Sequence, residues 1–166
     1  MKCLQSFVLG AIIIMFAGQS MAQNKLDAAY EANQKKDYIN GVYIPADMKD
    51  AFRELINLSD ESSLDKFKAG EEDVIARKLH FGLGKWIAVK WNFYEGSRFT
   101  KYLSEKGVTN PDDMVQFTIV SFHRFINQRP LELKERANVY KEMREKEWEE
   151  KLAKAKTISK RKVDKN

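Results

Sequence analysis

The chain has 166 residues and a formal net charge of +5, which invites interpretation as a nucleic-acid-binding protein. The positive excess lies at the two ends, however. Residues 23–153 carry 22 basic and 23 acidic side chains, whereas Lys154 to Asn166 carry six basic side chains and one acidic one. The near-neutral body argues against nucleic acid as a partner. We expect the basic end to be solvated, with contact to anionic lipid headgroups or acidic polymers as the alternative.

The first 22 residues have the three parts of a cleavable secretory signal. Lys2 precedes 11 apolar residues, Phe7 to Ala17, and the small residues Ser20 and Ala22 stand at positions −3 and −1 of a cleavage site before Gln23. The apolar run is shorter than the roughly 20 residues that a membrane-spanning helix needs. We therefore expect an exported protein, periplasmic or extracellular, that is soluble after cleavage near Ala22.

Cleavage of this signal would also remove Cys3, the only cysteine. The mature chain would then form no disulfide, carry out no thiol chemistry and hold no lipidated cysteine, even in a compartment that permits disulfides. Residues 23–166 are long enough for one domain of ordinary size, stabilised by a packed core.

Residues 23–42 are polar with scattered apolar positions, which predicts a linker. The helical domain is expected to span residues 43–130. Its first helix would hold Pro45 in its first turn, with Asp47 and Asp50 near its positive end. Ordered structure is thus predicted to begin with this helix.

Two more helices are expected before an aromatic turn. A short one ends at Gly70, a favourable C-terminal cap, and the next runs from there to about Trp91. Gly82 lies on the apolar stripe of that second helix, and because an interior glycine costs about 1 kcal/mol relative to alanine, we expect it to let a neighbouring helix come close. The stripe is predicted to be buried and consists of Ile75, Leu79, Gly82, Leu83, Trp86 and Ile87.

Two further helices follow the aromatic turn. A short helix is predicted from Arg98 to Lys106. Asn110-Pro111 followed by two aspartates is typical of a helix start, and the helix that begins there runs to Ile126. It is apolar around most of its circumference, so it should lie at the centre of the bundle.

From Leu131 to about Thr157 the charges alternate, with Glu-to-Lys or Glu-to-Arg pairs four residues apart that each stabilise a helix by about 0.2–0.5 kcal/mol. Apolar positions thin out along this segment, which predicts a long helix that docks by its first half and then projects. Residues 158–166 are expected to be a basic disordered tail. No segment alternates with a period of two for long enough to predict a strand. The predicted fold class is therefore all-α: a single-domain bundle of about five helices followed by a long charged C-terminal helix.

Two histidines, His80 and His123, are available for acid–base or metal chemistry. Zinc needs three or four converging ligands, and neither a His-x-x-x-His nor a Glu-x-x-His spacing is present. On the predicted central helix His123 shares a stripe with polar residues. Gly82-Leu83-Gly84 has neither the preceding strand nor the Lys-Ser/Thr pair of a phosphate-binding loop. Both histidines are expected to be structural, and we predict no catalytic residue, metal or cofactor.

Six aromatic residues crowd into residues 86–102, beside amide, carboxylate and guanidinium side chains. This combination suits a sugar or peptide site. The alternative is that the rings fill the corner where two helices meet, which Trp86 and Phe99 fit best. The residues expected to form a ligand site, if the turn holds one, are Trp91, Tyr94, Glu95 and Arg98.

Four stretches form a more specific pattern: Tyr43-Ile44-Pro45, His80 to Ile87 with its Gly-Leu-Gly-x-Trp-Ile core, Trp91 to Arg98, and Asn110 to Met114. Together they resemble a helical domain of unknown function common in Bacteroidota, over about residues 43–133. That family has Arg-Asn-Asn before the second tryptophan, where this chain has Ala88-Val89-Lys90 and so lacks the two amide side chains. The resemblance implies a helical fold and a bacterial envelope setting, and it implies no activity.

These observations lead to one functional prediction and two alternatives. The prediction is a non-enzymatic binding or interaction module of the bacterial envelope, with an envelope protein or a glycan as its partner. The first alternative is an envelope enzyme that acts on glycan or peptide with Glu95 as carboxylate and His80 as base. The second is a structural protein that docks a partner through the Leu131–Thr157 helix.

Overall fold

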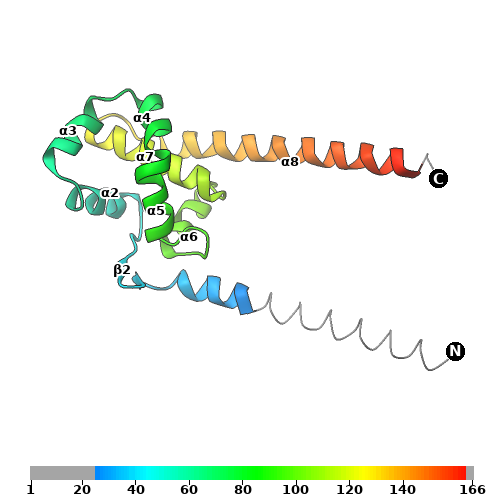
Figure 1. The fold of residues 1–166 in the computed structure, drawn as a ribbon, viewed down its shortest axis with the longest axis horizontal. Coiled ribbons are helices and arrows are strands. Elements are labelled where there is room, and N and C mark those ends of the chain that lie inside the picture. The colour runs from blue at the N-terminus through cyan, green and yellow to red at the C-terminus, as the bar shows by residue number, and fades with distance from the viewer. Residues whose placement is uncertain (1–24, 164–166) are drawn as a thin grey trace.

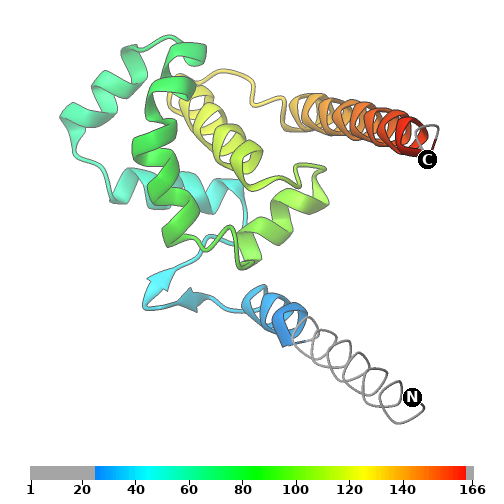
Figure 2. The same ribbon diagram turned by 45° about the vertical axis from the view of Figure 1, so that its right-hand side comes forward.

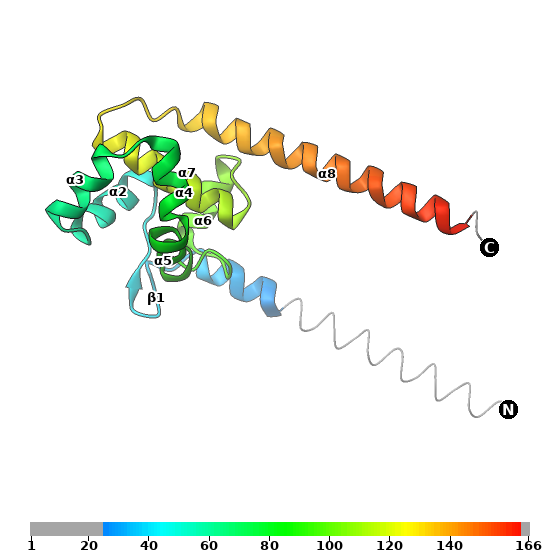
Figure 3. The same cartoon turned by 45° about the horizontal axis from the view of Figure 1, so that its top comes forward.

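The computed structural model describes residues 25–163, with side chains to residue 156. The chain forms a helical body from which the C-terminal helix projects, and it does so in all three ribbon views (Figure 1, Figure 2 and Figure 3). The predicted all-α fold with a long C-terminal helix is confirmed. The predicted signal at residues 1–22 lies outside the described residues.

Much of the segment predicted as a linker has regular structure. Residues 25–33 form a helix, and β1 (Tyr38–Ile39) pairs with antiparallel β2 (Val42–Tyr43). Asn40 and Gly41 connect the strands with φ of 50° and 76°, which is the backbone that a tight hairpin turn requires. The strands are too short for an alternation pattern, so Asn-Gly is the one sequence signal for this hairpin.

The first long helix, α2 (Met48–Asn57), begins after Pro45, not with it. Asp47 is its N-cap, and the Asp47 carboxylate accepts a hydrogen bond of 2.8 Å from the Asp50 N–H. An aspartate in extended conformation satisfies one of the free N–H groups of the first turn, which proline cannot do. Pro45 therefore precedes the helix, and Met48 on its first turn is already in the core.

The next helix, α3 (Glu61–Ala69), ends at Gly70 as predicted, but for another reason. The φ of Gly70 is −74°, so the left-handed cap that favours glycine does not form. A Cβ at Gly70 would instead lie 2.4 Å from the side chain of Ile75. A side chain at position 70 would therefore require Ile75 to move, because the chain turns closely against the helix that follows.

The predicted helix from Gly70 to Trp91 contains a π-helical turn. It consists of α4 (Glu72–Leu79), the π-helical segment η1 (His80–Gly84) and α5 (Lys85–Lys90), which form one column in Figure 1. A π-turn places an extra residue in the helix and so rotates the residues after it around the axis. The face that meets the body is therefore different from the face that a uniform helix would present.

This rotation makes the predicted packing role of Gly82 wrong. Gly82 is exposed, and a Cβ there would meet nothing within 4 Å. Gly84 has that role, since a Cβ there would lie 2.7 Å from Val115 Cγ1. Of the predicted stripe only Ile87 is fully buried. The other apolar members are half-buried at the edge of the core, namely Ile75, Leu79, Leu83 and Trp86.

The helices after the aromatic turn are as predicted. The structure has α6 (Arg98–Glu105) and α7 (Pro111–Ile126), and the Asn110 side chain caps α7 by accepting from the N–H groups of Asp112 and Asp113. Nearly all residues from Asp113 to His123 are buried, and α7 contacts α2, α3, α4, η1, α5, α6 and the C-terminal helix. The prediction that this helix is central is confirmed.

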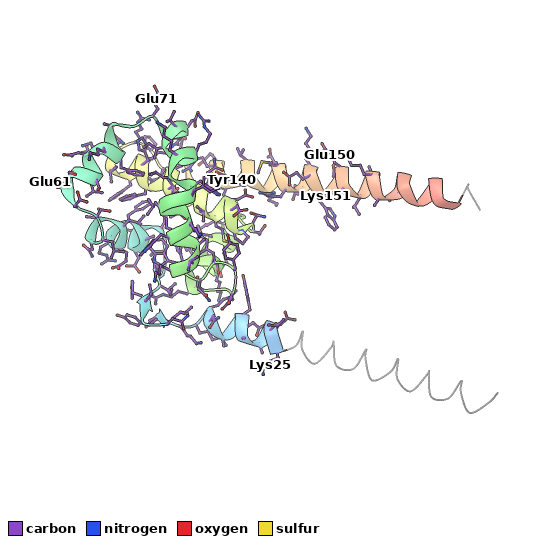
Figure 4. The ribbon with its side chains drawn as sticks, in the orientation of Figure 1. Lys25, Glu61, Glu71, Tyr140, Glu150 and Lys151 are labelled. Atoms are coloured by element: carbon purple, nitrogen blue, oxygen red, sulfur yellow. The ribbon has the colours of Figure 1, made fainter. Side chains whose placement is uncertain are left out.

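The C-terminal helix, α8 (Leu133–Val163), docks by its first turns and then projects. Ala137 is buried and the Tyr140 ring packs on Phe117, whereas every side chain from Trp148 to Lys156 is exposed. In Figure 4, Tyr140 lies where the helix meets the body, and Glu150 and Lys151 lie on the projecting part. The helix also continues past residue 157, into the segment expected to be a disordered tail, because its lysines and arginines are good helix formers.

Candidate functional site

Hydrogen bonds and a packed neighbouring helix hold the aromatic turn between α5 and α6. Asn92 and Gly96 have φ of 55° and 81°, and the Asn92 amide donates to the Gly96 carbonyl at 2.9 Å. A Cβ on Gly96 would lie 2.6 Å from the ring of Tyr30 in the helix over residues 25–33. The Asn33 amide also donates to the Glu95 carbonyl at 3.1 Å. The N-terminal helix thus packs against this turn.

Trp91, the first of the four predicted ligand-binding residues, is in the core. Its side chain is 1% exposed and meets Phe99 edge-to-face at 5.3 Å between ring centroids. A second edge contact, at 6.0 Å, joins it to Trp86. The Trp91 ring can reach a ligand only if the corner between α5 and α6 opens.

Arg98 is occupied by contacts within the fold. Its Nε donates to the Ile44 carbonyl at 2.7 Å, it forms an ion pair with Asp37, and its guanidinium lies 5.0 Å from the centre of the Tyr43 ring. Hydrogen bonding and charge together hold the hairpin against the start of α6. This arrangement gives Arg98 a structural role.

Of the four predicted residues, Tyr94 lines a hollow on the surface. Its side chain is 63% exposed, and the hollow has a volume of about 250 Å³. We call it the π-turn hollow, because it lies between the η1–α5 segment and the start of α7. Its other lining residues are His80, Phe81, Gly84, Lys85, Ala88, Val89, Asp112 and Val115.

The π-turn hollow combines exposed apolar groups with polar ones. Phe81 is 84% exposed and Val89 is 58% exposed, so folding leaves both largely in water. The His80 ring meets Phe81 edge-on at 5.3 Å. Lys85 and Asp112 add one cation and one carboxylate. Such a surface can stack on an apolar face of a ligand and hydrogen-bond to its hydroxyl or charged groups.

The structure does not assemble the enzyme site of the first alternative. His80 lines the π-turn hollow, but neither Glu95 nor Arg98 does. Glu95 is exposed on the turn, where its backbone carbonyl accepts from Asn33. The residues that sequence reasoning missed are Phe81, Lys85, Val89 and Asp112. They come together because the π-turn changes which side of the helix faces α7, and no simple periodicity reports such a turn.

His123 is buried, not at a polar edge as its stripe predicted. It is 1% exposed, and its Nε2 donates to the Gly70 carbonyl at 2.9 Å, at the junction of α3 and α4. Its Nδ1 is buried and has no hydrogen-bond partner in the part of the chain that the structure describes. The polar stripe on α7 did not indicate an exposed edge, because the α3–α4 corner covers this side of α7.

Within residues 25–163, no group of three or more His, Cys, Asp or Glu side chains could hold a metal ion. Within the same residues, no helix combines the length and the apolar character needed to cross a bilayer.

Comparison with known proteins gives one match. The family described as "Domain of unknown function (DUF6794)" matches residues 44–126, which is half of the chain. The match runs from the segment before α2 to the end of α7, so it includes the π-turn hollow and excludes α8. Searches of the curated proteins and of the solved structures return no match. The chain therefore belongs to the DUF6794 family of domains of unknown function.

Proposed function

We propose that this protein is an exported, non-enzymatic binding module of the bacterial envelope, and that the π-turn hollow is its ligand-binding surface. One observation carries the proposal: three large apolar side chains gather around one hollow and remain 58–84% exposed, namely Phe81, Val89 and Tyr94. Single exposed apolar residues are ordinary on a soluble domain, whereas a contiguous group around a concavity marks a binding site.

The side chains around the hollow favour a particular ligand chemistry. Phe81 and Tyr94 offer ring faces, while Lys85 and Asp112 offer a hydrogen-bond donor and an acceptor beside them. A glycan that carries peptide, such as a peptidoglycan fragment, has apolar sugar faces, hydroxyl groups and charged termini together. It is therefore the ligand class that we propose, in keeping with the Bacteroidota envelope setting implied by the sequence resemblance.

Export rests on the sequence pattern of the first 22 residues. If the signal is cleaved as proposed, N-terminal sequencing of protein recovered from the envelope or the medium gives Gln23 as the first residue. An intact Met1 on the recovered protein would contradict export by this route.

Binding can be tested by calorimetric titration of the mature chain with soluble peptidoglycan fragments. Phe81→Ser and Tyr94→Ser each remove an exposed ring, so they should leave the fold intact and weaken binding about tenfold. Ile56→Ser is the matched control, because Ile56 is also a surface residue but lines a different hollow, beside Phe125. Equal affinity in all three variants, or no binding by the wild type, would refute the proposal.

A second candidate function, docking of a partner protein through α8, has a specific observation in its favour. Trp148 and Leu152, one turn apart on the projecting part of α8, are 63% and 42% exposed, although Tyr140 is packed on Phe117. Affinity capture from envelope extract would compare the full chain with a chain that ends at Glu147. Equal recovery of partners by the two would dismiss the projecting part of α8 as the interaction surface.

A further inference from the structure

Arg136 of α8 is a half-buried cation that pairs with no carboxylate among residues 25–156. Its guanidinium donates to the Ser121 hydroxyl at 3.0 Å and to the Leu131 carbonyl at 3.3 Å, and it lies 4.9 Å from the centre of the Phe117 ring. In the described part of the chain it forms no ion pair with a carboxylate. Arg124 differs, since it pairs with both Glu72 and Glu132.

The surroundings of Arg136 disfavour its charge. Burial lowers the pKa of Arg136, and the nearby positive charge of Arg124 lowers it further, while the charges of Glu72 and Glu132 offset this only in part. An arginine remains protonated at neutral pH. Hydroxyl, carbonyl and ring contacts satisfy part of the guanidinium without neutralising it. The charge interaction between Arg136 and an anion beside it would therefore be more favourable in free energy than the same interaction at an exposed arginine.

A hollow beside Arg136 has room for such an anion. It lies between α4, α7 and α8, has a volume of about 330 Å³, and is distinct from the π-turn hollow. We call it the arginine hollow. Arg77 of α4 also lines it, is exposed, and has no ion-pair partner among residues 25–156. Gln116 of α7 and Tyr140 of α8 add neutral hydrogen-bonding groups.

Two carboxylates that line the arginine hollow limit the negative charge of the ligand that can bind there. Glu72 lines it but is held by Arg124 at 2.9 Å, which also keeps the pKa of Glu72 low despite its burial. Asp73 lines it as well and offsets one of the two arginines. The remaining excess of about one positive charge suits a monoanion better than a doubly charged phosphate. Val120 and Val139 line the rest of the hollow, so the anion should have an apolar body.

We propose that the arginine hollow binds a small organic carboxylate, of the kind found at the C-terminus of a peptide, through Arg77 and Arg136. The planar guanidinium group matches the geometry of a carboxylate and can bond both of its oxygens. The carboxylate would supply the counter-charge that Arg136 lacks. This site does not depend on the function proposed for the π-turn hollow.

The test is a titration of the ¹⁵N-labelled mature chain followed by NMR, with N-acetylalanine as probe and the uncharged N-acetylalaninamide as control. Saturable shifts are expected for amides around the arginine hollow with the first probe and not with the second. Arg77→Ala should weaken binding at least about fivefold, because a charge-assisted hydrogen bond is lost. Lys78→Ala is the matched control, since it removes the same charge from the next residue of α4 and does not line the hollow.

Three results would overturn the proposal. One is the absence of saturable shifts with N-acetylalanine, and another is equal binding by Arg77→Ala and Lys78→Ala. The third is tighter binding of inorganic phosphate than of N-acetylalanine, because it would contradict the monoanionic, partly apolar ligand. Arg136→Lys is a second test. It keeps the positive charge but loses the planar guanidinium that can bond both carboxylate oxygens, so binding should weaken while α8 stays docked.

Discussion

Gly82 and Gly84 lie close together in the same helical column but differ in the space that surrounds them. Gly84 lies where a Cβ would come within 2.7 Å of Val115, while Gly82 faces open space. Gly84→Leu should lower the free energy of unfolding by about 1–3 kcal/mol, because the core has no room for the side chain. Gly82→Leu should leave it unchanged or raise it, since leucine favours a helix more than glycine does. Urea unfolding of both variants measures the difference, and an equal loss in both would contradict the π-turn register.

Asp50 joins the hairpin region to α2 through its side chain. Its carboxylate accepts from the Tyr43 hydroxyl at 2.8 Å, from the Ala46 N–H at 2.9 Å and from Arg53 at 2.8 Å. Burial raises the pKa of Asp50, but the hydrogen bonds from Ala46 and Tyr43 and the charge of Arg53 outweigh it, so the pKa lies below its usual value of 3.8. The stability that Asp50 contributes is therefore present above about pH 4 and is lost as the pH falls through the folded-state pKa.

Tyr43→Phe tests this account of Asp50. Removing the hydroxyl takes away one hydrogen bond to the carboxylate, so the pKa of Asp50 should rise toward its usual value. A ¹³C NMR titration of the Asp50 carboxyl carbon measures it. Tyr38→Phe is the control, because Tyr38 touches the Tyr43 ring and makes no hydrogen bond to Asp50. The same titration midpoint in both variants would show that the Tyr43 hydroxyl does not stabilise the charged form.

At the scale of elements, α8 is fastened to the body by a bidentate ion pair. Arg144 donates to both carboxylate oxygens of Asp113 at 2.5 Å, and Asp113 is only 5% exposed. Arg144→Met should lower the free energy of unfolding by about 1–3 kcal/mol, less than the 3–5 kcal/mol for a fully buried pair because Arg144 is partly exposed. Chemical denaturation measures the loss. Lys141→Met, which changes an exposed side chain of the same helix, should have almost no effect.

The contribution of the ion pair to stability can also be tested by changing Asp113, the partner of Arg144. Adding Asp113→Asn to Arg144→Met removes the unpaired buried charge, so part of the lost stability should return. If the double variant is as unstable as the sum of the two single variants, the pair does not act as a unit.

The helices were predictable where the signal is local. Asn110-Pro111 with its aspartates predicts the start of α7, and the apolar circumference of α7 predicts its central place. The hairpin and the π-turn were not predicted, for two physical reasons. Two-residue strands have no periodicity to detect, and the π-turn is stabilised by how η1 packs on α7, which is a tertiary contact.

At the scale of the whole molecule, the body and the projecting part of α8 should be separable. A chain that ends at Glu147 keeps Ala137, Tyr140 and Arg144, so its free energy of unfolding should stay within about 0.5 kcal/mol of the full chain. A chain that ends at Pro130 exposes their contacts on α7 and should lose about 3 kcal/mol or more. Thermal and urea unfolding of the two truncated chains decide this, and a large loss at Glu147 would mean that the projecting part stabilises the body.

The candidate site was only partly predictable, because exposure is a property of the assembled fold. Aromatic density drew attention to residues 86–102, and Tyr94 lines a hollow there. The same density could not distinguish Trp91, which fills the corner, or Arg98, which holds the hairpin. Phe81 and Asp112 come from segments that only the packing of η1 on α7 brings near Tyr94.

The most direct test of the central claim is a map of ligand contact on the mature ¹⁵N-labelled chain, made by NMR titration with soluble peptidoglycan fragments. If the π-turn hollow is the binding surface, the saturable shifts concentrate on residues 80–94 and 112–115. The amides near Ile56 and Phe125, which line a different hollow, should stay unchanged. Shifts centred on those residues or on α8, or no saturable shift at all, would contradict the account.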